Sequence, residues 1–395
     1  MAMLSAWALA LAMTTVSLAC TDDLEEREPA TGSAGEGEGE GEGEGEGEGE
    51  GEGEGEGEGE GEGEGEGEGE GEGEGEGEGE GEGEGEGEGE GEGEGEGEGE
   101  GEGEGFVMPV RDVCGGSLGQ PANITIVDGA VVEVSGIVAS PTTPGLLWLH
   151  NDSGDDAQLY AVATDGRFLG ALVLPGVTAV DFEDLAAAPC PDGDGACLWV
   201  ADVGDNGNGR ASVAVYAVRE PVVDVGAAFG VVDASRVWHL PFTLEGGPGD
   251  VEGVVVLPDA SAVVLFQKVN DGARIHRLDG PFTEDVVAVA TLRGTFNTPG
   301  TGQALRLVTG ADLHPSGTRL LLRTYQALFE ANLGDGLAVD GVTGSDFVEV
   351  LRPLEAQGEA VCFDEDGSGV WTVSEQVTVS GFTLPNPLHH AVCTP

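Results

Sequence analysis

From residue 106 to residue 395 the chain is a succession of short apolar runs separated by turn residues. The runs are rich in Val, Leu and Ala, and Gly, Pro and Asp interrupt them. None has apolar positions at the 3.6-residue spacing of a long amphipathic helix. Many short strands with regular turn signals are typical of β-sandwiches, barrels and propellers. The pattern therefore predicts an all-β domain over residues 106–395.

A sequence unit that occurs five times in this domain decides among these architectures. Each unit has a first strand with a small or acidic pair, a turn, and a second apolar strand. The first strands are VSGIVAS from Val134, DFEDLAA from Asp181, DVEGVVV from Asp250, TGADLHP from Thr309 and QGEAVCF from Gln357. Trp148, Trp199 and Trp371 occupy the same place in three of the second strands. Units repeating every ~50 to 70 residues indicate four-stranded antiparallel propeller blades.

The two ends of the domain supply what one more blade needs. The fifth unit ends after LHHAVCTP, and an unassigned apolar run, NITIVDG, precedes the first unit. Strands from both termini often combine in one blade and so close a propeller ring. We therefore predict a β-propeller of five four-stranded antiparallel blades. Six blades are the alternative, because the interval between the second and third units is long.

The first twenty residues predict export. They form an apolar stretch of signal-peptide length that ends in small residues before Cys20. This end resembles the lipobox of bacterial lipoproteins, and the resemblance implies a lipid on Cys20. We then expect the protein at the cell envelope, on the outer membrane or cell surface, touching the membrane only through that anchor. An ordinary cleavable signal and a secreted protein are the alternative.

Residues 21–105 are predicted to be a disordered linker. Residues 35–104 are an unbroken alternation of Gly and Glu, which has no apolar side chain to bury. A Gly-rich coil of that length spans about 45 Å, and repulsion between the glutamates extends it. The linker is thus an acidic tether for the domain.

The folded domain is itself acidic. The formal net charge of the chain is -63, of which the repeat supplies 35 carboxylates, and residues 106–395 still carry 37 acidic against 13 basic residues. Nucleic acid and anionic lipid are poor partners for such a surface. We expect a monomer whose partners are cations, neutral or basic small molecules, or a surface partner.

Cysteine spacing predicts two disulfides in an exported protein. Cys190 and Cys197 bracket the turn-rich PDGDGA, while Cys114 and Cys393 lie at opposite ends of the domain and would lock the closing blade. Cys362 lies in the apolar run EAVCF, which indicates a small buried core residue and not a nucleophile.

The first strand of each propeller blade lines the central channel, so equivalent positions form a ring. The aligned members are Ser135, Glu183, Glu252, Ala311 and Glu359, with Asp184 and Asp312 one position further along. The ends of the second strands return to the same face and form a polar rim. The rim residues are His150, Asn151, Asp152, Asp202, Asp205, Asn206, Lys268, Arg323 and Glu375.

Convergent carboxylates repel one another unless a cation or a basic side chain compensates them. A hard, oxygen-ligated ion such as Ca²⁺ is one solution, and we predict Glu183, Glu252 and Glu359 as its ligands. Basic side chains are the other, and they would suit a ligand carboxylate or phosphate. The predicted ligand-binding residues are His150, Asp152, Asp202, Lys268, Arg323 and Glu375. A channel that is merely solvated remains as a third interpretation.

Other polar segments favour plain structural roles. The loops 150–156 and 201–209 are dense in Asp, Asn and Gly, which favours tight turns over calcium ligation. His389 and His390 are adjacent near the C-terminus, and we expect them in a solvated tail.

The five units resemble secreted bacterial phytase-like and esterase-like β-propellers. They are more distantly similar to gluconolactonase and regucalcin-type propellers, which hold calcium on the axis. The resemblance implies Ca²⁺ as cofactor with Glu183, Glu252 and Glu359 as axial ligands. Ala311, however, leaves one blade without a carboxylate at that position.

These patterns favour one function and leave an alternative. We expect a surface-anchored, exported propeller that binds a cation, a small ligand or a surface partner through its acidic axial rim. The alternative is a calcium-dependent hydrolase of an ester, phosphoester or lactone, with Lys268 or Arg323 holding the anion. The sequence has no H-E-x-x-H, Walker or C-x-x-C motif, and it assigns no catalytic residue.

Overall fold

The computed structural model describes residues 119–126, 130–300, 302–350, 355, 357–379, 382–384 and 386–392. The predicted signal peptide with Cys20, the linker, and the predicted Cys114–Cys393 pair lie outside these residues. Within them, no helix has the length and apolar character needed to cross a membrane.

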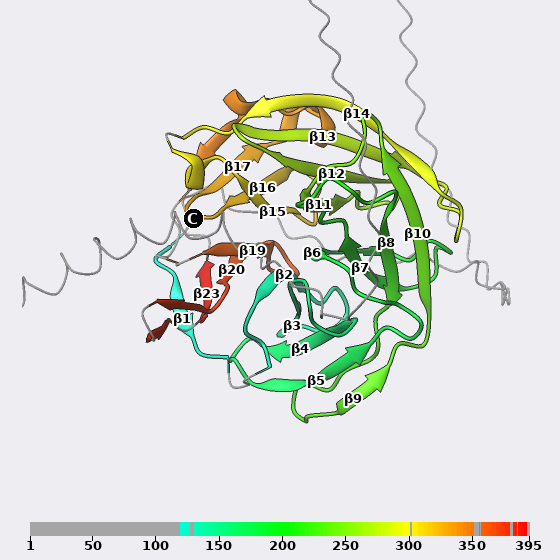
Figure 1. Ribbon diagram of the computed structural model, residues 1–395. Coiled ribbons are helices and arrows are strands. Elements are labelled where there is room, and N and C mark those ends of the chain that lie inside the picture. The colour runs from blue at the N-terminus through cyan, green and yellow to red at the C-terminus, as the bar shows by residue number, and fades with distance from the viewer. Residues whose placement is uncertain are drawn as a thin grey trace, which may run out of the picture. The chain divides into compact units, whose positions relative to one another are not determined.

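The described strands form five blades arranged around one axis (Figure 1). Blade 1 contains β2 (Val134–Ala139), β3 (Leu146–Asn151), β4 (Gln158–Ala163) and β5 (Phe168–Val173). Blade 2 contains β6 (Phe182–Pro189), β7 (Ala196–Asp202), β8 (Val213–Arg219) and β10 (Val237–Leu244). Blade 3 contains β11 (Val251–Val256), β12 (Ala262–Val269), β13 (Gly272–Asp279) and β14 (Ala288–Asn297). Blade 4 contains β15 (Val308–Leu313), β16 (Arg319–Thr324), β17 (Leu328–Asn332) and β18 (Phe347–Glu349). Blade 5 contains β19 (Gly358–Phe363), β20 (Gly369–Ser374), β23 (Leu388–Val392) and β1 (Ala122–Ile124). The predicted all-β propeller of four-stranded antiparallel blades is confirmed.

Short elements decorate this ring. The 3₁₀ turns are η1 (Gln303–Leu305), η2 (Gly334–Gly336), η3 (Val339–Gly341) and η4 (Gly344–Asp346), and β21 (Val377–Val379) pairs with β22 (Phe382–Leu384). β9 (Gly230–Asp233) pairs in parallel with β5 as a fifth strand of blade 1. β9 therefore accounts for the long interval between the second and third units, which does not hold a sixth blade.

The ring closes with strands from both ends of the domain, as predicted. β1 pairs antiparallel with β23, placing Asn123 opposite His389 and Ile124 opposite Leu388. The expectation of a solvated tail at His389 and His390 is therefore wrong. Both histidines lie in β23: His389 is buried, and His390 stacks on Trp371 and bonds to Asp364.

The innermost strands β2, β6, β11, β15 and β19 contact one another in a closed circle around the axis. In each, the ladder to the second strand is interrupted by one unpaired residue, a β-bulge. The bulge residues are Ser135, Glu183, Glu252, Thr309 and Glu359. The alignment of Ala311 with the glutamates is therefore wrong. In blade 4, Gly310 pairs with Arg323 and Val308 with Thr324, so Thr309 takes the bulge position.

The core consists of apolar side chains packed within and between neighbouring blades. Trp148 and Trp199 are fully buried, and Cys362 is a buried free cysteine, as predicted. The predicted disulfide joins Cys190 to Cys197 and closes the β6–β7 hairpin.

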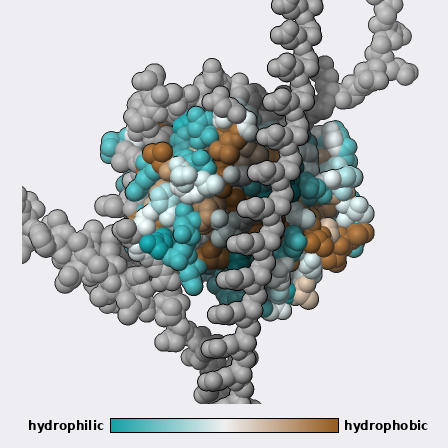
Figure 2. All heavy atoms as spheres, turned by 90° about the horizontal axis from the view of Figure 1, so that it is seen from above, coloured by the Kyte–Doolittle hydropathy of each residue, from teal (hydrophilic) through white to brown (hydrophobic). Residues whose placement is uncertain are grey.

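Figure 2 shows hydrophobic residues among hydrophilic ones on the outer side of the domain. The large exposed apolar residues near β14 are Val286, Val287, Val289 and Leu292.

The equivalent tryptophans of blades 1 and 2 predict unequal costs of truncation. The indole Nε1 of Trp148 donates to Glu220 Oε1 at 2.9 Å, whereas that of Trp199 is buried with no partner in the described part of the chain. Both Trp→Phe changes remove buried volume, but only Trp148→Phe also removes a hydrogen bond to a carboxylate. We expect Trp148→Phe to lower the free energy of unfolding by about 1–2 kcal/mol more than Trp199→Phe. Urea titration measures both, and equal losses would contradict the expectation.

Candidate functional site

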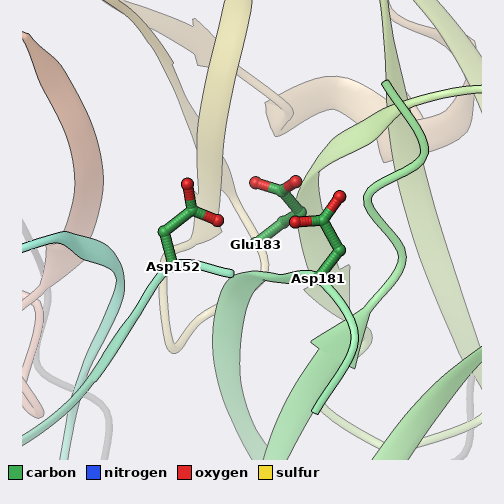
Figure 3. A group of neighbouring side chains, drawn as sticks. All are labelled: Asp152, Asp181 and Glu183. Atoms are coloured by element: carbon green, nitrogen blue, oxygen red, sulfur yellow. The ribbon is translucent and has the colours of Figure 1, made fainter. Parts of the chain in front are cut away.

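Two groups of three carboxylates, which share Glu183, lie at one end of the central channel. The first trio is Asp152, Asp181 and Glu183, and the second trio is Glu183, Asp250 and Glu252. In each trio, one carboxylate oxygen per residue lies within 4.8 Å of the others. Figure 3 shows the side chains of the first trio pointing toward one another. Such a set of oxygens is suited to a hard divalent cation.

The blade repeat positions these side chains. Glu183 and Glu252 are bulge residues of β6 and β11, Asp181 and Asp250 precede them by two positions, and Asp152 follows β3 directly. Because β3 runs antiparallel to β2, its end returns to the face where the first strands begin. The first trio is thus built from blades 1 and 2, and the second trio from blades 2 and 3.

Backbone contacts fix the surrounding loops. The Asp181 amide donates to Asp202 Oδ1 at 3.1 Å, and the Asp205 amide donates to Asp250 Oδ1 at 2.8 Å. A Cβ on Gly204 would lie 2.0 Å from Glu183 Oε1 and 2.4 Å from Asp181 Oδ2. A side chain at position 204 would therefore displace the carboxylates of Glu183 and Asp181 from these positions.

The two trios differ in their counter-charge. Lys268 Nζ lies 3.0 Å from Asp250 Oδ2 and contacts Glu252 Oε1, so an ammonium compensates the second trio. Among the described residues, no ion pair involves Asp152, Asp181 or Glu183. The first trio is therefore the one that has no basic side chain in direct contact with its carboxylates among the described residues.

Burial and mutual repulsion raise the pKa values of these carboxyl groups. Burial, with repulsion from Asp152 and Asp250, raises the pKa of Asp181 to about 6. Burial and the neighbouring Glu252 raise the pKa of Glu183 well above its ordinary value. Burial raises the pKa of Glu252 to about 8, although Lys268 opposes the rise. At neutral pH the cluster is therefore stabilised by bound protons or by a cation.

A second acidic pair belongs to blade 5. The Gln357 side-chain amide donates to Glu359 Oε1 at 3.1 Å and to Glu375 Oε2 at 2.7 Å. Burial raises the pKa of Glu375 to about 7, and burial with repulsion from Glu375 raises the pKa of Glu359. Of the three glutamates predicted as metal ligands, the structure groups Glu183 with Glu252, while Gln357 holds Glu359 beside Glu375.

The remaining predicted ligand-binding residues contact other parts of the blades. His150 is 1% exposed and its ring packs edge-on against Phe182. Asp202 Oδ1 pairs with Arg210 Nη2 at 2.8 Å. Arg323 is fully buried, and its guanidinium contacts the Glu355 carboxylate. Both His150 and Arg323 pair with the residue after a bulge, and there their side chains are enclosed in the blades.

Two members of the trios, Asp181 and Asp250, were missed as ligands in the sequence. The signal that could have identified them is the repeated D-x-E in DFE and DVE. A pleated strand would normally put residues two apart on one face, and the same spacing brings each aspartate beside its glutamate here.

The carboxylate of Asp184, one position after Glu183, accepts hydrogen bonds from backbone amides and belongs to neither trio. It is fully buried, and its Oδ2 accepts hydrogen bonds from Val254 N at 2.7 Å and Ala311 N at 3.1 Å. Its Oδ1 accepts one from Leu185 N at 2.8 Å. Asp184 therefore ties blade 2 to blades 3 and 4.

A cavity of about 220 Å³ lies near the second trio, although no member of either trio lines it. Its lining includes Asp205, Arg210, Ser212, Phe242 and Gly249. The Asp205–Asp250 hydrogen bond links its wall directly to the acidic cluster.

Comparisons with known proteins complement this geometry. No protein-family model and no curated protein matches the chain. The structure of U3-55K is 12% identical, and the match covers 69% of this chain and 100% of that one with a TM-score of 0.36. The WD40 repeats of RRP9 are 13% identical, with coverages of 70% and 100% and a TM-score of 0.36. The hydrazine synthase of Kuenenia stuttgartiensis is 15% identical, with coverages of 68% and 99% and a TM-score of 0.33. The strand order itself defines the class of the described domain, a five-bladed β-propeller with buried acidic groups at one end of its channel.

Proposed function

We propose that this propeller binds a divalent cation in the first trio and uses it to hold a small ligand or a surface partner. The observation that carries the proposal is the convergence of Asp152, Asp181 and Glu183 without a basic side chain paired to them in the described part of the chain. Ca²⁺ takes about six to eight oxygen ligands at flexible geometry, and carboxylates, carbonyls and water all supply them. Three protein carboxylates would leave positions open for water or a ligand oxygen.

Binding is favoured over hydrolysis by the state of the basic residues. A phosphoester or carboxylate substrate would need a free cationic side chain to hold its anion. Lys268 is paired with Asp250 and Glu252, Arg210 with Asp202, and Arg323 with Glu355. A small neutral ligand therefore suits the site better than an anion. A calcium-dependent hydrolase of uncharged esters or lactones is the second candidate, and the coordination positions that three carboxylates would leave open on the cation are what favours it.

The proposed setting is the cell envelope, with the domain displayed on its Gly-Glu tether from a lipid on Cys20. The signal-like N-terminus supports it. The Cys190–Cys197 disulfide does so as well, because disulfides persist in exported proteins.

Calorimetric titration of the full chain with CaCl₂ tests the proposal. We expect a saturable site in the parent and a loss of affinity of about 100-fold in Glu183→Gln, which removes a charge shared by both trios. Glu349→Gln is the matched control, because Glu349 is an exposed glutamate of β18. The 35 glutamates of the repeat are the same in every variant, so their weak binding is a common background. Equal binding by the parent and Glu183→Gln would refute the site.

A further inference from the structure

Lys268 is the only lysine in the 395-residue chain, whose other 13 basic residues are arginines. It lies near the end of β12, and its side chain is 15% exposed. The Lys268 amide donates to Asp250 O at 2.7 Å, which fixes its backbone in the rim. In blades 1 and 5 the amides of Asp152 and Glu375 donate to the corresponding carbonyl, just before the first strand, so these two residues occupy the position of Lys268 in their blades. One blade thus puts a cation where two others put carboxylates.

The ammonium contacts two of the three carboxylates of the second trio. Lys268 Nζ lies 3.0 Å from Asp250 Oδ2 and also contacts Glu252 Oε1. A lysine ammonium is a compact point charge, whereas an arginine guanidinium is a planar fork. A compact cation among carboxylate oxygens reproduces the electrostatic role of a bound metal.

We infer that Lys268 is a tethered cation that fills the second trio, so that the rim takes up one divalent cation, in the first trio, and not two. This role of Lys268 rests on the proposed function, and it would set the number of divalent cations that the rim binds. Two metal ions bridged by one carboxylate, about 3.5–4 Å apart, are the arrangement of many hydrolytic centres. Because Glu183 is the shared residue, Lys268 prevents that arrangement here and keeps the site a single-cation binding site.

Calcium titration of the full chain with Lys268→Met and Lys268→Arg tests this inference. Lys268→Met removes the charge, and we expect its saturable sites to rise from one to two. Lys268→Arg keeps the charge and is the control, for which we expect one site. If Lys268→Met binds one ion with the affinity of the parent, Lys268 fills no cation position and the inference is overturned.

The same titration separates this inference from the proposed function. If the parent binds no ion, the proposed function fails. In that case one ion bound by Lys268→Met would still support the inference, because the ion would replace the ammonium. No ion bound by either protein would overturn both.

A measurement on the unmutated side chain guards against a variant that does not fold. Full chain labelled with ¹³C at lysine Cε gives one side-chain signal, because Lys268 is the only lysine. Because the two trios share Glu183, a paramagnetic Mn²⁺ ion in the first trio would lie close to Lys268. We therefore expect one equivalent of Mn²⁺ to broaden the lysine signal strongly. In Glu183→Gln we expect this broadening to be absent. A sharp signal in a parent that calorimetry shows to hold one Mn²⁺ would overturn the inference.

Discussion

Asp184→Ala is expected to lower the free energy of unfolding by about 3–5 kcal/mol. The Asp184 carboxylate is fully buried and accepts hydrogen bonds from the amides of Leu185, Val254 and Ala311. Removing it leaves these three amides without this acceptor, and each buried unsatisfied amide costs about 1–3 kcal/mol. Because Val254 and Ala311 belong to β11 and β15, the loss falls on the contacts that hold three blades together.

Urea unfolding of the full chain measures the effect of Asp184→Ala. Asp184→Asn keeps one acceptor oxygen, but its NH₂ group cannot accept a hydrogen bond from a backbone amide. We therefore expect an unfolding free energy between those of the parent and Asp184→Ala. Asp233→Asn is the matched control, because Asp233 is an exposed carboxylate of β9, and a change within about 0.5 kcal/mol is expected there. A loss below about 1 kcal/mol for Asp184→Ala would contradict the prediction, since buried amides without acceptors cost more than that.

The architecture was predictable because it repeats. Each blade must bury a similar apolar face against its neighbours, so the apolar runs and the buried tryptophans recur at a regular interval. The closing blade was also predictable, since β23 needs a partner and the unassigned NITIVDG run supplies it as β1. The misplaced His389 and His390 show the limit of this reasoning. They belong to a strand whose polar side chains are satisfied by Asn123 and Asp364 from elsewhere in the chain.

The register around the channel was not predictable to the residue. A bulge adds one unpaired residue to a strand, and no side-chain pattern in TGADLHP shows that the bulge falls on Thr309 and not on Ala311. In the structure, Thr309 Oγ1 donates to Gly358 O at 2.9 Å, and Ser135 Oγ donates to Glu183 O at 2.7 Å. Two of the bulge residues therefore join neighbouring blades through a hydroxyl, where the three others carry carboxylates.

The separate roles of neighbouring acidic residues depend on the same bulge. Glu183 belongs to both trios, while Asp184, the next residue, accepts backbone hydrogen bonds. Sequence places both in the channel but cannot say which carboxylate meets backbone amides, because those amides come from β11 and β15. The partners of Lys268 and Arg323 were unpredictable for a similar reason, since each carboxylate partner is set by the packing of separate segments.

The cation-free protein is expected to lose stability as the pH rises from 6.5 to 8.5. Burial raises the pKa of Glu375 to about 7 and that of Glu252 to about 8, from an ordinary value of 4.5. A carboxyl group whose pKa is higher in the folded state contributes stability below its unfolded value, and that contribution is lost as the pH rises through the folded value. Glu252 and Glu375 lose their protons within this window, as does Asp312, whose pKa burial raises to about 7, so the melting temperature should fall by several degrees.

The window isolates the carboxyl groups. Burial lowers the pKa of His150 and lowers that of His314 to about 4, so stability from these neutral histidines is lost only below about pH 6.5. The proton of Asp181, with a pKa of about 6, is mostly gone at the start of the window. Because we expect the Gly-Glu repeat to be a disordered linker, its glutamates should not distinguish the folded from the unfolded state of the domain.

Thermal unfolding in chelator at pH 6.5 and 8.5, repeated with excess CaCl₂, measures the effect. The proposed calcium site exists only in the folded state and needs ionised carboxylates, so calcium should raise the melting temperature more at pH 8.5 than at 6.5. In Glu183→Gln we expect the calcium effect to disappear at both values, while Glu349→Gln should behave as the parent does. A melting temperature in chelator that is constant or rises with pH would mean that these carboxyl groups are ionised without cost. The electrostatic strain that the proposed cation relieves would then be absent.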